Sequence, residues 1–424
     1  MDHAVSPYPD QRDCSVLYLS YDGMTDPLGG SQVLPYLTGL AERGHRIRLI
    51  SFEKPSRRNL EREAVQVLCN AACIRWYPLP YHKQPPVLSS VYDVTAMQRM
   101  GERLHREEPA DLVHCRSDIP ALVGLAMKRR HRTRFLYDMR AFWPDERIEG
   151  GLWNLRNPLY RVIYRYFKQR QADFLREADH IVSLTEAGRN VLLARSDRPP
   201  DGPPIVVIPC CVDFDTFPII DDKRRAEARA LLGIAPERRV VAYLGSIGTW
   251  YMLGEMLDFF RAQLARDPQA LFLLVTRDNQ DEILAAAAQR GIDPSTLLIR
   301  PALRPQVPVF LAAADYGLFF IKPVFSKIAS CPTKLGELLA LGLPVVTNTG
   351  VGDVDRAVGE ICAGVLISQF DDEAYRQALD RLATFTANRG SLRDGARRWF
   401  DLDQGIQRYD AIYREAWRPS PLSE

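Results

Sequence analysis

The segment 321–346 carries the strongest candidates for chemistry in this chain. It follows a predicted buried strand, contains Lys327 and Lys334, and has Pro332 at a position that favours the start of a helix. The free N–H groups at that helix start, together with the ammonium groups, can hold a diphosphate. Glu337 lies about one turn into the helix, where its carboxylate can accept two hydrogen bonds from a ribose diol. The alternative is a solvated basic loop in which Glu337 only balances the helix dipole. The donor-binding candidates of this segment are Ser330, Thr333, Lys334 and Glu337.

A glycine-containing loop follows the first predicted strand of each half of the chain. Gly29 and Gly30 precede a helix expected near Ser31, and residues 245–251 precede a second helix. Glycine lets backbone N–H groups approach an anion closely, and the helix dipole adds partial positive charge there. Both loops are therefore predicted to approach the diphosphate, with turns that serve only backbone geometry as the alternative. The donor-binding candidates of the second loop are Ser246, Gly248 and Thr249.

Asp138 and Arg140 follow another predicted strand, in a loop that concentrates acids, arginines and aromatic residues. The Asp138 carboxylate can accept a hydrogen bond or a proton from a substrate hydroxyl, and Arg140 can stabilise a departing diphosphate. With Lys327 they are the catalytic candidates, and an ion pair that only shapes the loop is the alternative. His114 and Arg116 follow a neighbouring strand, where the histidine is expected to be a hydrogen-bonded structural residue.

The predicted helix 159–178 has apolar side chains on one side and arginines such as Arg161 and Arg165 elsewhere. A basic helix with aromatic residues can rest on an anionic membrane surface, which would favour a lipid-linked acceptor. The alternative is an apolar stripe that faces the protein core and a basic face that is solvated.

Two runs of alternating strands and helices must position these residues. Short β-branched strands separated by helical patterns are typical of parallel sheets that are covered on both faces. The first run has predicted strands at 16–19, 47–50, 112–114, 135–137, 181–184 and 205–208. The second run has them at 240–244, 271–276, 297–299, 317–321, 344–347 and 365–367. The predicted fold is α/β, with two tandem Rossmann-like, doubly wound domains and a ligand cleft between them, because such sheets bind ligands beyond the carboxyl ends of their strands.

The second run of strands and helices begins after the last strand of the first run, which places the domain boundary between residues 209 and 222. Residues 1–213 are expected to form the acceptor-side domain and residues 214–400 the donor-side domain. An amphipathic helix at 402–417 follows the second unit, so residues 401–424 are expected to pack back across the junction.

The composition is ordinary for a soluble globular protein. The 424 residues are 46% hydrophobic and 25% charged, with a formal net charge of +2, which gives no electrostatic case for nucleic acid as a partner. The eight cysteines lack paired spacing and are expected to be reduced thiols. Residues 1–12 have no apolar core, and no apolar run approaches the roughly 20 residues that span a bilayer. The expected location is the cytoplasm, either free or peripheral on the inner face of the cell membrane.

The chain resembles the retaining family 4 glycosyltransferases of the GT-B fold over nearly its whole length. The resemblance rests on Gly29 and Gly30, the segment 207–213, the loop at Gly245, the helix 333–341 and the segment 342–346. Residues 246–251 combined with 330–335 resemble a bacterial subgroup. The resemblance implies a nucleoside-diphosphate sugar as donor, such as a UDP- or GDP-sugar, transfer with retention of configuration, and no required cofactor or metal. It also implies that Glu337 binds the nucleotide ribose.

Three positions depart from the family pattern. The family's first glutamate, which usually contacts donor sugar hydroxyls, falls on Ala329. The usual arginine and lysine after the first strand of the second domain are absent, and Lys327 or backbone N–H groups can supply their charge. The family often has Asn-Gly at the crossover, where this chain has Cys210 and Cys211.

The expected function is sugar transfer to a hydroxyl of a glycan, a glycolipid or a small-molecule acceptor, in cell-surface glycan or glycolipid synthesis. One alternative is a sugar-nucleotide epimerase on the same scaffold, since fold does not fix function. The other is an inactive partner that binds a nucleotide sugar, which the missing first glutamate permits. A glycosylated product distinguishes the enzyme from both alternatives.

Overall fold

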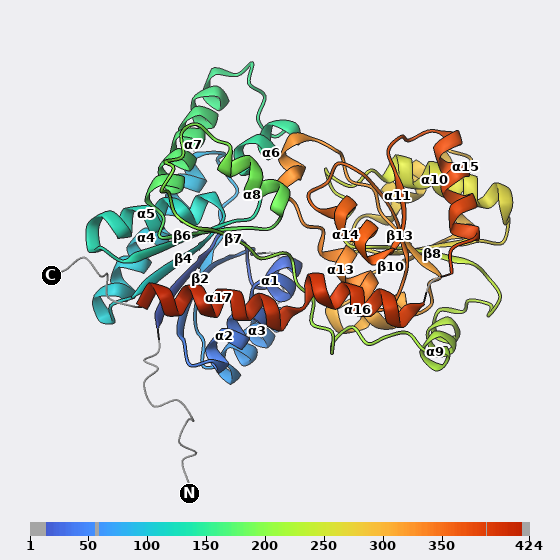
Figure 1. Cartoon of the computed structure of the whole chain (residues 1–424), viewed down its shortest axis with the longest axis horizontal. Coiled ribbons are helices and arrows are strands. Elements are labelled where there is room, and N and C mark those ends of the chain that lie inside the picture. The colour runs from blue at the N-terminus through green and yellow to red at the C-terminus, as the bar shows by residue number, and fades with distance from the viewer. Residues whose placement is uncertain (1–13, 56–58, 387, 418–424) are drawn as a thin grey trace, which may run out of the picture.

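A computed structural model describes residues 14–55, 59–386 and 388–417 of the chain. Figure 1 shows two lobes side by side, one formed by the first half of the chain and the other by most of the second half. The N-terminal segment 1–12 and the last residues of the expected C-terminal segment, 418–424, lie outside the described residues.

The N-terminal lobe is built on a seven-stranded parallel sheet in the order β3-β2-β1-β4-β5-β6-β7. Its strands are β1 (Ser15–Ser20), β2 (Arg46–Glu53), β3 (Arg75–Pro80), β4 (Leu112–Arg116), β5 (Arg134–Met139), β6 (His180–Ser183) and β7 (Ile205–Val207). Along β1, Val16 and Tyr18 pack in one core cluster and Leu17 and Leu19 in another. Both faces of the sheet are therefore covered, which explains why the four consecutive positions 16–19 of β1 are all apolar or aromatic.

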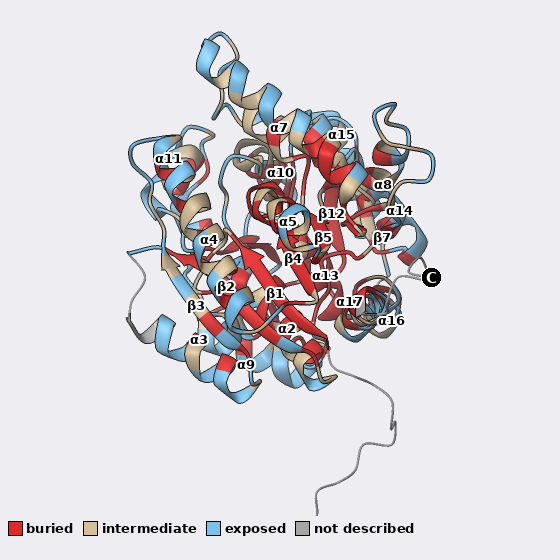
Figure 2. Cartoon of the chain, turned by 90° about the vertical axis from the view of Figure 1, so that its left-hand side faces the viewer, coloured by how far each residue is buried: buried red, intermediate tan, exposed pale blue. Residues whose placement is uncertain are grey.

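Helices provide the covering layers on the two faces of this sheet. They are α1 (Pro27–Gln32), α2 (Leu34–Glu42), α3 (Asn59–Ala71), α4 (Leu88–Glu107), α5 (Asp118–His131), α6 (Trp143–Glu149), α7 (Pro158–Glu177) and α8 (Glu186–Leu193). Side chains of α2 and α3 pack in the first cluster, and side chains of α4, α5 and α7 pack in the second. Figure 2 shows the buried strands enclosed by helices whose outer faces are exposed.

The C-terminal lobe repeats this plan with a six-stranded parallel sheet in the order β10-β9-β8-β11-β12-β13. Its strands are β8 (Val240–Leu244), β9 (Leu271–Val275), β10 (Leu297–Arg300), β11 (Tyr316–Leu318), β12 (Val345–Asn348) and β13 (Gly364–Ile367). Its helices are α9 (Asp222–Leu232), α10 (Leu253–Arg266), α11 (Gln280–Ala288), α12 (Val307–Leu311), α13 (Thr333–Ala340), α14 (Val354–Ile361), α15 (Asp372–Ala383) and α16 (Arg389–Phe400), with the short 3-10 helices η1 (Pro294–Thr296), η2 (Arg304–Gln306) and η3 (Phe325–Ala329). The predicted α/β fold with two tandem doubly wound domains is confirmed.

The chain passes between the lobes twice at one place. After β7, the Val212 N–H donates to the Phe400 carbonyl at 2.7 Å, and the Leu402 N–H donates to the Val212 carbonyl at 3.1 Å. Helix α17 (Leu402–Trp417) then lies on the N-terminal lobe, where Ile406 and Tyr413 are buried in its first core cluster. Figure 1 shows α16 and α17, in dark red, running from one lobe to the other.

Two local expectations are wrong. The first helix begins at Pro27 and not near Ser31, because proline favours the first helical turn, so Gly29 and Gly30 lie inside α1. The predicted strands omit β3, which the structure places at the edge of the sheet, where Pro78 and Pro80 are tolerated.

Two expectations from composition can be compared with the structure. All eight cysteines are free, as predicted. Among the helices of the described residues, none combines the length and the apolar character needed to cross a bilayer.

Candidate functional site

A cavity of about 340 Å³ lies between the lobes and is lined by residues of both. From the N-terminal lobe the lining includes Leu28, Gln32, Arg116, Arg140, Glu146 and Arg147. From the C-terminal lobe it includes Trp250, Lys327, Ser330 and Thr333. The structure therefore brings Arg140, Lys327 and the start of α13 to one shared space, where the sheet topology predicted a ligand.

Lys327 reaches this cavity from η3 and is almost fully buried, with 6% of its side chain exposed. Its Nζ forms an ion pair with Glu146 of α6, in the other lobe, and lies 3.7 Å from the centre of the Trp250 ring. Burial lowers the pKa of the Lys327 ammonium, while Glu146 opposes that change. Lys327 is thus a buried cation at the cavity, paired with a carboxylate of the other lobe.

The loop that carries Lys327 is held against the N-terminal lobe by several other contacts. The Ser326 N–H donates to Glu149 Oε2 at 2.9 Å, and Thr185 Oγ1 donates to the Ile328 carbonyl at 2.8 Å. The rings of Phe142 and Phe325 are stacked with centroids 4.9 Å apart. The two lobes are therefore in direct contact along one side of the cavity.

The contact between the lobes explains the departure at Ala329. Its side chain is 0% exposed and packs in a core cluster of the N-terminal lobe, together with Leu192. A Cβ added to Gly188 of α8 would lie 3.1 Å from the Ala329 Cα. A glutamate at this position would bury a carboxylate in an apolar contact, which is costly without a partner. Position 329 thus faces the neighbouring lobe and does not line the cavity.

Lys334 and Glu337 lie on α13 but are not among the residues that line the cavity. The Lys334 Nζ donates to Tyr243 Oη at 2.9 Å and lies 3.3 Å from the centre of the Tyr251 ring, and burial lowers its pKa well below the usual range. Glu337 is 5% exposed and forms an ion pair with Arg304. The diphosphate contact expected of Lys334 would require its ammonium to leave the two tyrosines.

The two glycine loops are already hydrogen-bonded within the protein. Ser246 Oγ donates to the Asp278 carboxylate at 3.0 Å, while Gly248 and Thr249 are exposed. The loop therefore holds an anion as expected, but that anion is the side chain of Asp278.

In the first glycine loop the N–H of Gly30 donates to the Asp26 carbonyl at 3.2 Å within α1. A Cβ on Gly29 would lie 2.3 Å from the Gly23 carbonyl oxygen, so only glycine fits there. The expected N–H contacts of these glycines with a diphosphate are therefore not preformed, although Leu28 and Gln32 of α1 line the cavity.

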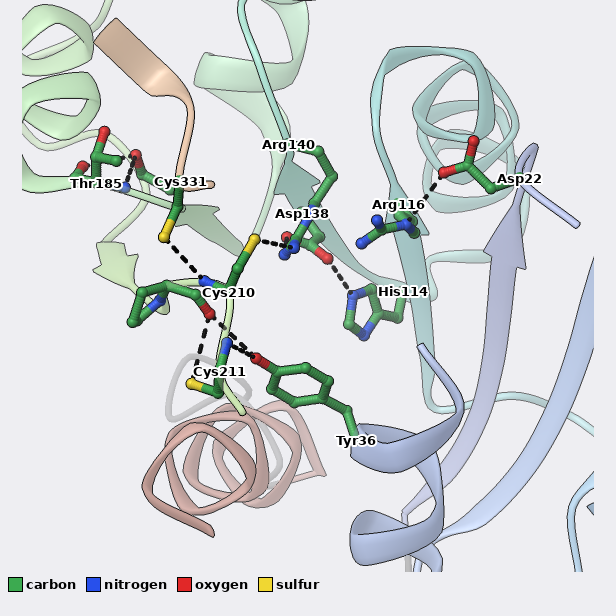
Figure 3. Close-up of polar contacts among 12 residues, drawn as sticks. Asp22, Tyr36, His114, Arg116, Asp138, Arg140, Thr185, Cys210, Cys211 and Cys331 are labelled. Atoms are coloured by element: carbon green, nitrogen blue, oxygen red, sulfur yellow. Dashed lines mark hydrogen bonds and ion pairs between the residues drawn. The ribbon is translucent and has the colours of Figure 1, made fainter. Parts of the chain in front are cut away.

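Asp138 is enclosed by its neighbours and does not line the cavity. Its Oδ1 accepts from Arg140 Nη1 and its Oδ2 contacts His114 Nε2, both at 3.3 Å, as Figure 3 shows. Burial alone would raise the pKa of Asp138, but Arg140 and His114 hold it below the usual range. Burial lowers the pKa of His114, whose Nδ1 lies 2.7 Å from Tyr413 Oη, which agrees with the expected structural role. Asp138 thus orients Arg140 toward the cavity.

Cys210 and Cys331 bring the crossover segment next to the start of α13. The Cys210 N–H lies 3.4 Å from Cys331 Sγ, and the Cys210 thiol lies 3.6 Å from Arg140 Nη2. A hydrogen bond from Cys331, with the nearby Arg140 and Arg116, lowers the pKa of the Cys210 thiol. The sequence drew attention to this cysteine only as a departure from a family pattern.

Other cavity residues were not assigned a role from the sequence. Arg116 ends β4 directly beside β5, so its place at the carboxyl edge of the sheet was the available signal. Glu146 and Arg147 belong to the acidic and basic loop after β5, but nothing in the sequence distinguishes them from their neighbours. Within the described residues, no group of three or more histidine, cysteine, aspartate or glutamate side chains could hold a metal ion.

Two family models match the chain. Residues 31–216 match Glycosyltransferase Family 4, and residues 238–384 match Glycosyl transferases group 1. The D-inositol 3-phosphate glycosyltransferase of Salinispora arenicola is 26% identical over 322 residues, which cover 72% of this chain and 69% of that protein. The protein of the same name from Saccharomonospora viridis is 29% identical over 325 residues, covering 73% of this chain and 72% of that protein.

Solved structures share the two-lobed architecture at low sequence identity. Sucrose-phosphate synthase of Thermosynechococcus elongatus superposes with a TM-score of 0.72 at 15% identity, covering 95% of this chain and 98% of that one. The glycosyltransferase WaaG, involved in lipopolysaccharide biosynthesis, gives 0.67 at 16% identity, covering 94% and 99%. Anabaena HepE in complex with UDP-glucose gives 0.65 at 15% identity, covering 95% and 99%. At these identities the likeness is one of fold.

Proposed function

Because this chain belongs to the family 4 glycosyltransferases and has their GT-B fold, we propose that it transfers a sugar from a nucleoside-diphosphate sugar to an acceptor hydroxyl with retention of anomeric configuration. The observation that carries the proposal is the cavity shared by the two lobes, in which Lys327 and the start of α13 face Arg140. Positive charge from two lobes around one space suits a leaving diphosphate, whose charge grows as the glycosidic bond breaks. The HepE structure with UDP-glucose supports a nucleotide sugar as the donor.

In the proposed reaction the residues of this chain mainly supply electrostatic stabilisation. The N-terminus of α13, with Thr333 in the cavity lining, offers N–H groups to the diphosphate. Lys327 and Arg140 add positive charge as the leaving group departs, and Asp138 keeps Arg140 in place. The acceptor hydroxyl attacks from the face that the diphosphate leaves, and the diphosphate takes its proton. Contact between the lobes excludes water and limits hydrolysis.

A panel of UDP- and GDP-sugars, measured by thermal shift, tests the donor. A donor present at about 100 times its dissociation constant adds roughly 2.7 kcal/mol to the free energy of unfolding, so the melting temperature is expected to rise for sugars of one base. The matching nucleoside monophosphate, which lacks one phosphate, should give a smaller shift. Product analysis by mass spectrometry with the stabilising donor should then find a glycosylated acceptor. No shift with any nucleotide sugar, or an isomerised sugar nucleotide as the product, would contradict the proposal.

We further propose that the protein works at the inner face of a membrane, in cell-surface glycan or glycolipid synthesis. The apolar side chains Leu159, Val162 and Tyr166 of α7 are 52%, 64% and 46% exposed, so one side of this helix presents apolar residues to solvent, while Phe167 on another side is half-buried against Trp143. Arg161 and Arg165 of the same stretch are also exposed. Apolar and basic side chains together on one exposed helix suit an anionic lipid surface.

Flotation with vesicles tests this membrane surface. The protein is expected to bind vesicles that contain phosphatidylglycerol and not vesicles of phosphatidylcholine alone, because each arginine near an anionic surface contributes about 1 kcal/mol. Val162→Ser should weaken flotation several-fold, since it removes apolar area from the helix. Leu231→Ser is a matched control, because Leu231 is 64% exposed on α9 of the other lobe. Equal flotation of the two variants would argue against α7 as the contact.

A further inference from the structure

The guanidinium group of Arg116 is buried at the cavity with part of its hydrogen-bonding capacity unused. Only 4% of its side chain is exposed, and its Nε donates to Asp22 Oδ2 at 3.3 Å. Its Nη1 is buried and has no hydrogen-bond partner among the described residues. Figure 3 shows Arg116 between Asp22 and the group formed by Asp138 and Arg140.

Arg140 lies on the same side of the cavity and also has an N–H group without a hydrogen-bond partner. Its Nη1 donates to Asp138 and its Nη2 contacts Cys210, but its Nε is buried without a partner. An unpaired buried N–H costs about 1–3 kcal/mol, and more where the group is charged. The buried, unpaired Nη1 of Arg116 at the cavity, with Arg140 beside it, therefore leaves hydrogen-bonding capacity that a ligand oxygen can satisfy.

The charge balance indicates that this ligand is an anion. Of the two carboxylates paired with Arg116 and Arg140, Asp138 is buried and Asp22 is 48% exposed, so water screens the charge of Asp22. The planar guanidinium fork binds carboxylate and phosphate groups through paired hydrogen bonds. Two arginines from the ends of adjacent strands suit a group with several oxygens and about two negative charges, which is the chemistry of a phosphate.

The position of Arg116 separates it from the C-terminal groups assigned to the donor, whereas Arg140, which is assigned to the leaving diphosphate, lies in the same lobe as Arg116 and borders both ligands. Lys327 and the start of α13 belong to the C-terminal lobe, whereas Arg116 ends β4 in the N-terminal lobe. We propose that the acceptor carries a phosphate group, which Arg116 binds with Arg140 beside it, so that the acceptor hydroxyl is held next to the donor sugar. This inference rests on the proposed function, because it assigns the acceptor of that same site. A soluble phosphate ester and a lipid phosphate share this chemistry.

Calorimetric titration of the full chain, saturated with the nucleoside diphosphate found in the donor screen, tests the inference. Glycerol 3-phosphate and glycerol are the soluble probes, and vesicles with phosphatidic acid or with diacylglycerol in phosphatidylcholine are the lipid probes. We expect the protein to bind glycerol 3-phosphate at least tenfold more tightly than glycerol, or vesicles with phosphatidic acid at least tenfold more tightly than vesicles with diacylglycerol. A preference within the soluble pair identifies a soluble phosphate ester as the ligand, and a preference within the lipid pair identifies a lipid phosphate.

Substitution then assigns the effect to Arg116. Arg116→Gln is expected to lower the affinity for the phosphate probe about tenfold or more. Its affinity for the nucleotide should stay within twofold of that of the unaltered protein. Arg116→Lys keeps the charge without the fork and should give an intermediate loss, even if the glutamine variant folds poorly. Arg103→Gln makes the same charge change at a side chain that is 53% exposed on α4, and should change nothing.

Several outcomes would overturn the inference. Equal affinity for the phosphate-containing and the neutral probe, in both the soluble and the lipid pair, would show that there is no anion site at Arg116. A parallel loss of nucleotide affinity in Arg116→Gln assigns the guanidinium to the donor diphosphate. If no nucleotide sugar binds or reacts while the phosphate probe still binds in an Arg116-dependent way, the proposed function fails and the anion site stands.

Discussion

Replacing Lys327 with methionine is expected to lower kcat by about 100- to 1,000-fold, the cost typical of losing one group that stabilises charge in a transition state. The ammonium is desolvated at the cavity, with 6% of the side chain exposed, so its field on a departing diphosphate is weakly screened. Methionine keeps the length of the side chain and its packing near the Trp250 ring. Steady-state kinetics with the identified donor should show the loss in kcat, with KM for the donor changed much less.

Glu146→Gln is the matched control, because it removes the same interlobe ion pair and leaves the Lys327 ammonium in place. Its kcat should fall less than that of Lys327→Met. The pH profile adds a second readout. Burial lowers the pKa of Lys327 and Glu146 raises it, so activity should be present below that pKa and be lost as the pH rises through it. Removing the Glu146 charge should move this alkaline limb to lower pH. Equal losses in both variants would assign the effect to contact between the lobes.

The strands in both sheets' interiors could be predicted from sequence, because burial on both faces requires apolar residues at nearly every position. β8 and β9 are buried along their whole length, and both have such runs. The edge strand β3 could not be predicted, since one side of an edge strand needs no hydrogen bonds and its prolines hide the pattern. The location of the cavity followed from topology, because Arg116 and Arg140 follow adjacent strands whose carboxyl ends meet at one edge.

The directions of the candidate side chains could not be predicted, because residues distant in the chain set them. Lys334 donates a hydrogen bond to Tyr243, which lies 91 positions earlier and itself donates to the Ser246 carbonyl of the glycine loop. Asp138 is covered by its neighbour Arg140 and by His114, which is fixed in turn by Tyr413 of the last helix. The absence of a glutamate at Ala329 was visible in the sequence, but its cause lies in the opposite lobe. The spacing of residues along the sequence thus predicted where the site lies. Contacts with distant parts of the chain determine which of the candidate side chains face it.

Glu337→Ala is expected to weaken binding of the donor's nucleoside diphosphate by about 100-fold or more. Two hydrogen bonds from a ribose diol to a carboxylate contribute about 1.5–3 kcal/mol each, and 1.4 kcal/mol corresponds to a tenfold change in affinity. In the structure Arg304 forms an ion pair with this carboxylate, so binding of the ribose requires Arg304 to give way. Calorimetric titration should show the loss, and the 2′-deoxy nucleotide should bind the unaltered protein more weakly than the ribonucleotide.

Comparing the affinities for the ribonucleotide and the 2′-deoxy nucleotide distinguishes a direct contact of Glu337 with the ribose from a purely structural role. If the carboxylate binds the diol, Glu337→Ala should bind the ribo and deoxy forms with nearly equal affinity. Arg304→Gln is the matched control, because Arg304 is 36% exposed and its loss leaves the carboxylate free. That variant should keep both the affinity and the preference for ribose, since one competitor for Glu337 is gone. A Glu337→Ala protein that still prefers the ribonucleotide would place the diol elsewhere, and the ion pair with Arg304 would then serve only to fix α13.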